Sequence, residues 1–140
     1  QRADARVLMP VHPNPAVRSL VERVLGDCPA VRICPPLDVV NFHNLMARAR
    51  MILTDSGGIQ EEAAALGVPT LVLRDRTERP EGIDAGVLRL AGTSFEGVYG
   101  GFCELYDSAV LRETMKNAKN PYGDGRASAR IADILEECIM

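Results

Sequence analysis

The sequence has 140 residues, 25% of them charged, and a formal net charge of −3, which is typical of one ordinary globular domain. Its uncharged apolar runs are far shorter than the roughly 20 residues that cross a bilayer, so we expect no membrane span. Sixteen basic residues against 19 acidic ones disfavour nucleic acid as a partner. The first residues lack the pattern of a secretory signal, so we expect a cytoplasmic protein.

Short apolar runs alternate along the chain with helical periodicity. We predict strands at residues 7–9, 31–34, 51–54, 70–73 and 87–90. We predict helices at about residues 15–25, 38–49, 59–66, 108–118 and 124–138, with Asn14, Asp38 and Asp124 as caps and Gly26 and Gly67 as stops. This alternation indicates an α/β, Rossmann-like fold, a mostly parallel sheet flanked by helices on both sides, in a single domain 1–140.

The four cysteines, Cys28, Cys34, Cys103 and Cys138, do not have the paired close spacings of a zinc site. We therefore expect reduced thiols, no metal and no disulfide framework.

The segment from Thr54 to Glu62 is the strongest candidate for a binding site. It places Ser56, Gly57 and Gly58 between a predicted strand and a predicted helix, where N–H groups of the first helical turn attract anions and glycines allow close approach. The alternative is structural, with Ser56 capping the helix and the glycines turning the chain. The segment lacks the lysine of a P-loop.

Glu62 follows on the same helix and can accept hydrogen bonds from sugar hydroxyls. Its neighbour Glu61 is interpreted as an exposed helix charge. The residue types alone do not separate the two carboxylates.

Three further segments stand out, and the first two have two interpretations each. His12, after the first strand, is either a phosphate donor or a satisfied structural histidine. The charged segment 74–81 is either a solvated loop or a phosphate or sugar contact. The segment 120–125 is explained mostly by Asp124 as a helix cap.

Four motifs in this order closely resemble the non-hydrolysing UDP-N-acetylglucosamine 2-epimerases. They are Pro10–Pro15, Leu53–Glu62, Thr77–Glu81 and Asn120–Gly125. The resemblance extends from His12 to about Leu135. It implies the nucleotide-binding, C-terminal half of a glycosyltransferase-B-type fold. We expect the N-terminal catalytic domain, and the βα unit that opens this half in the family, to be absent from the sequence.

The resemblance also implies an isomerase that interconverts UDP-GlcNAc and UDP-ManNAc by elimination and re-addition of UDP, in the supply of cell-envelope polysaccharide. Neither a cofactor nor a metal is implied. UDP-GlcNAc or UDP is the expected partner, and a homodimer the expected assembly. The 140 residues alone are expected to be inactive, because the family's acid–base carboxylates belong to the other domain and none of the motifs here is catalytic.

Carried over from the family, Ser56, Gly57 and Gly58 would hold the diphosphate and Glu62 the ribose. Phe42 and the backbone at Leu37 would contact the uracil. His12 would contact a second, activating UDP-GlcNAc, and Arg79 and Glu81 would belong to a loop near the site, in roles that the resemblance does not define. Two alternatives stay open: a UDP-binding module without catalysis, and half of a glycosyltransferase of the same fold.

Overall fold

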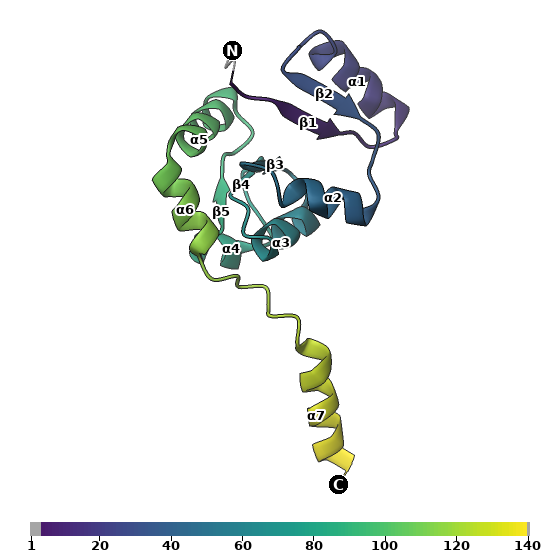
Figure 1. Cartoon of the computed structure of the whole chain (residues 1–140), viewed down its shortest axis with the longest axis vertical. Helices are drawn as coiled ribbons and strands as arrows, with labels where there is room; N and C mark the ends of the chain where they lie inside the picture. Colours follow the sequence, from purple (N-terminus) through teal and green to yellow (C-terminus); the bar gives the residue numbers. More distant parts are fainter. Residues whose placement is uncertain (1–3, 140) are drawn as a thin grey trace. The chain divides into compact units, whose positions relative to one another are not determined.

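The computed structural model describes residues 4–139 (Figure 1). Contacts divide the chain into two compact units, Gln1–Phe42 and His43–Met140. The prediction of a single domain stays a prediction.

The first unit contains two parallel strands and the helix between them. Strand β1 (Val7–Pro10) pairs in register with β2 (Val31–Cys34), and α1 (Pro15–Leu25) connects them. The predicted cap of α1 is confirmed, because Asn14 Oδ1 accepts a hydrogen bond from the Ala16 N–H at 2.9 Å. Gly26 lies at the C-cap as predicted, in the right-handed conformation.

Helix α2 (Val39–Met46) runs from the first unit into the second, and its predicted cap is also confirmed. Asp38 Oδ1 accepts from the Asn41 N–H at 3.0 Å. This hydrogen bond, together with one from the Asn41 side chain, lowers the pKa of the Asp38 carboxyl.

The second unit is built on a three-stranded parallel sheet in the order β3-β4-β5. The strands are preceded and followed by helices in the predicted alternation, and every described strand pairing is parallel, as predicted. The elements are β3 (Ile52–Thr54), α3 (Gly57–Ala65), β4 (Thr70–Val72), α4 (Pro80–Asp84), β5 (Leu88–Leu90), α5 (Phe95–Asp107), α6 (Ala109–Asn117) and α7 (Ala127–Ile139).

The central strand β4 has an apolar cluster on each face. Successive strand residues point to opposite faces, so Val72 packs with Ala64 of α3 while Leu71 packs with Leu105 of α5 and Met115 of α6. The sheet of this unit is therefore covered on both sides, by α3 on one and by α5 and α6 on the other. Ala64 lies in the last turn of α3, so its contact with Val72 holds that helix against the sheet.

Two helices of the second unit were not predicted, and two begin elsewhere than predicted. The short α4 and the longer α5 are additional elements. Helix α3 begins at Gly57, two residues earlier than predicted. Helix α7 begins at Ala127 instead of Asp124, so Asp124 is not its cap residue: the Asp124 carboxylate accepts from the Arg126 N–H before the helix and from the Arg130 guanidinium in the first turn of the helix. None of the described residues of α7 is buried.

Gly82 is the point at which Tyr122, of segment 120–125, packs against α4. It is buried, and a Cβ there would lie 2.1 Å from the Tyr122 hydroxyl and 2.6 Å from Leu88 Cδ1. Burial is the main reason why the pKa of Tyr122 is raised. Glycine at position 82 thus allows Tyr122 to close over α4.

We expect Gly82→Ala to destabilise the chain by about 1–3 kcal/mol, because the added methyl group overpacks a buried contact. Urea denaturation followed by circular dichroism measures the change. Tyr122→Phe in the same background should recover part of the loss, since it removes the nearest atom but leaves Leu88 in place. Equal stability of Gly82→Ala and the unmodified chain would contradict this packing.

Candidate functional site

The predicted anion site lies where β3 ends and α3 begins. Thr54, the last residue of β3, is buried, and its Oγ1 accepts a hydrogen bond from the Ser56 N–H at 3.1 Å. Ser56 is the N-cap residue of α3. Unlike Ser94 and Ser108, which cap α5 and α6 through their hydroxyls, Ser56 makes no side-chain cap hydrogen bond in the described structure. Ser56 thus holds the N-cap position that the structural alternative expects, but its hydroxyl does not make the capping hydrogen bond.

Gly57 and Gly58 are the first two residues of α3. Neither has a positive φ, and a Cβ built on either would meet no atom within 4 Å among the described residues. Neither a turn nor internal crowding therefore requires glycine there, although glycine weakens a helix. The first-turn N–H groups of α3 have no partner within the helix, and the side-chain positions of Gly57 and Gly58 are open among the described residues, so that a ligand could approach the backbone there.

Glu62 lies farther along α3 and pairs with a residue that sequence reasoning missed. Its Oε2 is 3.2 Å from Nε2 of His43 on α2, and both side chains are about two-fifths exposed. No motif around His43 signals this pairing, which depends on the packing of α2 beside α3. Glu62 remains accessible to a ligand, and its second carboxylate oxygen has acceptor capacity to spare.

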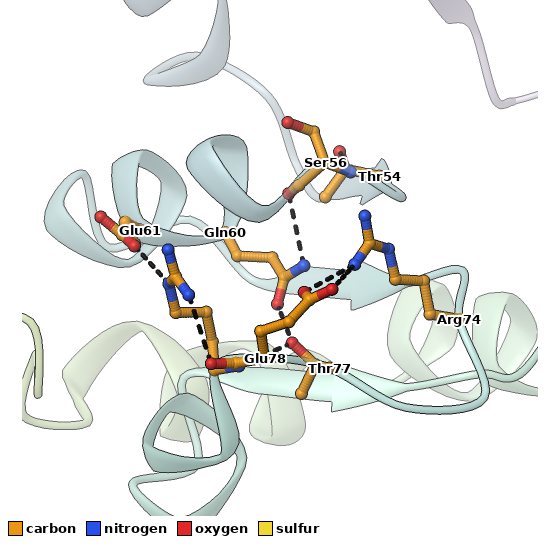
Figure 2. Close-up of polar contacts among 8 residues, drawn as sticks. Thr54, Ser56, Gln60, Glu61, Arg74, Thr77 and Glu78 are labelled. Atoms are coloured by element: carbon orange, nitrogen blue, oxygen red, sulfur yellow. Dashed lines mark hydrogen bonds and ion pairs between the residues drawn. The ribbon is translucent and has the colours of Figure 1, made fainter.

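Glu61 has a different partner from Glu62. Arg79 donates from Nε to a Glu61 carboxylate oxygen and from Nη1 to the Glu78 carbonyl oxygen (Figure 2). The hydrogen bond to Glu61, and then its charge, raise the pKa of Arg79. The interpretation of Glu61 as an exposed helix charge is wrong, because Glu61 joins α3 to the segment that precedes α4.

The same segment is held at its other end by a second ion pair. Arg74 Nη1 lies 2.6 Å from Glu78 Oε2. A hydrogen bond from Glu78's own backbone N–H, and then the charge of Arg74, lower the pKa of Glu78. Glu81, by contrast, is exposed in the first turn of α4. Two ion pairs, Arg74–Glu78 and Arg79–Glu61, therefore involve this loop.

The other predicted site residues belong to the first unit. His12 is exposed, and its Nδ1 accepts from the Asn14 N–H at 3.2 Å, so that Nε2 of the neutral ring is the donor. Leu37 is exposed and Phe42 is half-buried. The roles of His12 toward a second nucleotide sugar, and of Leu37 and Phe42 toward uracil, stay predictions.

A cavity of about 250 Å³ lies at the opposite end of the β3-β4-β5 sheet, beside Pro69, Arg50 and Arg112. Its two guanidinium groups are used within the fold, because both donate to the carbonyl oxygens that end α5.

Neither a metal-binding cluster of His, Cys, Asp and Glu nor a helix able to span a membrane occurs among residues 4–139.

Comparison with known proteins assigns this chain and its fold to a family. Residues 1–136 match the UDP-N-acetylglucosamine 2-epimerase family. The UDP-N-acetylglucosamine 2-epimerase of Bacillus subtilis is 51% identical over 132 residues, which cover 94% of this chain and 35% of the relative. That of Escherichia coli K12 is 46% identical over 133 residues, which cover 95% of this chain and 35% of the relative.

Solved structures agree. The S. aureus MnaA–UDP structure superposes with a TM-score of 0.91 at 46% identity, covering 99% of this chain and 38% of that one. The UDP-GlcNAc 2-epimerase of Neisseria meningitidis bound to UDP-GlcNAc gives 0.82 at 41% identity, covering 94% and 36%.

The chain belongs to the UDP-N-acetylglucosamine 2-epimerase family, and the α/β, glycosyltransferase-B-like fold class predicted from the sequence is confirmed. It spans about a third of the length of the curated relatives that it matches.

Proposed function

We propose that the start of α3 holds the diphosphate of a UDP-sugar, with Ser56, Gly57 and Gly58 as donors and Glu62 as the acceptor for ribose hydroxyls. The observation that carries the proposal is the pair of glycines with open space above them, next to a serine hydroxyl that the helix does not use. Relatives solved with UDP and with UDP-GlcNAc support the choice of ligand.

We further propose that this site is the nucleotide-holding part of a 2-epimerase acting on UDP-GlcNAc and UDP-ManNAc. Breaking the anomeric C–O bond leaves negative charge on the departing diphosphate. Fixed N–H donors at a helix N-terminus stabilise that charge more strongly as it grows, which lowers the barrier to elimination. Re-addition of UDP at C1, with a proton delivered to the opposite face of C2 of the glucal intermediate, would then use the same donors.

The residues assigned here bind and stabilise, and none of them is proposed to move the C2 proton. We therefore expect the 140-residue chain to bind UDP without converting UDP-GlcNAc to UDP-ManNAc. Homodimer formation, which the resemblance implies, stays a prediction.

The proposal is tested by calorimetric titration of the chain with UDP and with uridine. We expect UDP to bind at least about tenfold more tightly, since charge-assisted hydrogen bonds to a phosphate are among the stronger ones. Chromatography of a parallel incubation with UDP-GlcNAc monitors turnover. Equal affinities for UDP and uridine would exclude a diphosphate site at α3, and formation of UDP-ManNAc would show that catalytic groups lie within the chain.

A further inference from the structure

Gln60 is the most buried polar side chain beside the proposed site. It lies in the first turns of α3, its exposed fraction is 0%, and it is among the largest fully buried side chains described. A buried amide is costly unless its donors and acceptor are satisfied. Its partners therefore show what it is built to hold.

Both ends of the Gln60 amide have partners. Its Oε1 accepts from Thr77 Oγ1 at 2.7 Å, and its Nε2 donates to the Ser56 carbonyl oxygen at 3.3 Å (Figure 2). The reverse orientation of the amide would set two oxygen acceptors against each other at Ser56. The Ser56 carbonyl thus fixes which way the amide lies.

The direction of the Thr77 hydrogen bond is fixed as well. The Arg79 N–H donates to Thr77 Oγ1 at 3.1 Å, so the hydroxyl oxygen is already used as an acceptor on that side. Its single proton is left for Gln60 Oε1. A directed chain of hydrogen bonds therefore runs from the Arg79 backbone through Thr77 and Gln60 to Ser56.

This chain reaches Ser56 from the side away from the proposed ligand. The Ser56 N–H is held by Thr54, and its carbonyl oxygen accepts from both the backbone and the side chain of Gln60, each at 3.3 Å. Neither contact uses the Ser56 hydroxyl or the N–H groups of Gly57 and Gly58. Figure 2 shows the Ser56 side chain pointing away from Gln60.

We propose that Gln60 and Thr77 are positioning residues that hold the Ser56–Gly58 turn in the geometry in which it receives the diphosphate. The inference rests on the proposed function. It gives segment 77–81 a role that the sequence resemblance leaves undefined: Thr77 of this segment supports the Ser56–Gly58 turn through its hydrogen bond to Gln60. Preorganised donors bind an anion without a cost of reorganisation, so loosening the brace should weaken diphosphate binding in particular.

Titration of Thr77→Val with UDP and with uridine tests the proposal. Valine keeps the shape of threonine but cannot donate to Gln60. We expect UDP to bind about tenfold more weakly and uridine to change less than about twofold, while Thr77→Ser restores UDP binding. The matched control is Thr114→Val, because Thr114 Oγ1 donates only to the Val110 carbonyl on the exposed side of α6; it should change neither affinity.

Gln60→Leu should have the same selective effect on UDP binding. Because both residues act in one chain of hydrogen bonds, the double variant Gln60→Leu/Thr77→Val should bind UDP no less tightly than the single variant that has the lower UDP affinity. Equal losses for UDP and uridine would indicate general loosening and overturn the inference. If a folded Thr77→Val variant binds UDP as tightly as the unmodified chain does, the positioning role of Gln60 and Thr77 is overturned and the proposed function stands. If the unmodified chain does not bind UDP, both the positioning role and the proposed function are overturned.

Discussion

Gly58→Ala is expected to stabilise the chain and to weaken UDP binding at the same time. Alanine is the better helix former by up to about 1 kcal/mol, and its methyl group would meet no other atom of residues 4–139 within 4 Å. The same methyl group would project into the space above the first turn of α3. If the unfolding midpoint rises while the affinity for UDP falls, the loss of affinity does not result from partial unfolding.

Gly58→Val should enlarge the binding loss. If the bulkier side chain keeps the diphosphate from two N–H donors, each worth about 1.5–3 kcal/mol toward a charged acceptor, the affinity for UDP falls about a hundredfold or more. Calorimetry and thermal unfolding of both variants measure the two effects.

Gly100→Ala is the matched control for this experiment. Gly100 is also a helical glycine, in α5, and a Cβ there would likewise meet no atom within 4 Å in the described part of the chain. Its replacement should stabilise the chain and leave UDP binding unchanged. If Gly58→Ala behaves as Gly100→Ala does, the open space above α3 is not a ligand site.

Glu62→Ala should weaken UDP binding about tenfold or more, because the ribose hydroxyls lose a charged acceptor. The ligand 2′-deoxy-UDP makes the test specific. The unmodified chain should prefer UDP over 2′-deoxy-UDP, and Glu62→Ala should lose most of that preference. Both measurements use the same titration.

Glu104→Ala serves as control, since Glu104 also forms a half-exposed ion pair, 2.8 Å from Arg89, on a different helix. It should leave both affinities unchanged. If Glu62→Ala reduces UDP and 2′-deoxy-UDP binding to the same extent, Glu62 does not contact the 2′-hydroxyl and acts on the site by another route, such as its pairing with His43.

The sequence predicts the strands and the parallel pairing well because short β-branched runs bounded by Gly and Pro are local signals. It misses α5, although Phe95, Tyr99, Phe102 and Tyr106 recur at helical spacing, because three glycines lie within that segment. Two of the three are there for packing. A Cβ on Gly97 would lie 2.2 Å from the Ala91 carbonyl oxygen, and one on Gly101 would lie 3.0 Å from Leu71. From the sequence alone, glycines that allow a helix to pack closely against its neighbours cannot be told from glycines that interrupt a helix.

The candidate site shows the same limit. The turn at Ser56–Gly58 is visible in the sequence because strand, glycines and helix are consecutive. Gln60 is not, since its partner Thr77 is 17 residues away and an isolated glutamine carries no motif. Likewise, the sequence leaves Glu61 and Glu62 unseparated, and only the positions of Arg79 and His43 distinguish them. What is missed depends on contacts between segments distant in the chain.

The alternation of Leu71 and Val72 on β4 divides the buried apolar residues of the sheet between two clusters, one on each face. The Val72 side carries α3 and the proposed site, and the Leu71 side carries α5 and α6. Because Leu71 and Val72 point to opposite faces of the strand, we expect substitutions at Leu105 to add to those at Ala64 instead of coupling with them. Ala118, which follows α6, packs against the Val72 cluster and lies outside this expectation. The α5–α6 side is therefore free to vary in sequence, or to be redesigned for stability, while the turn at α3 keeps its shape.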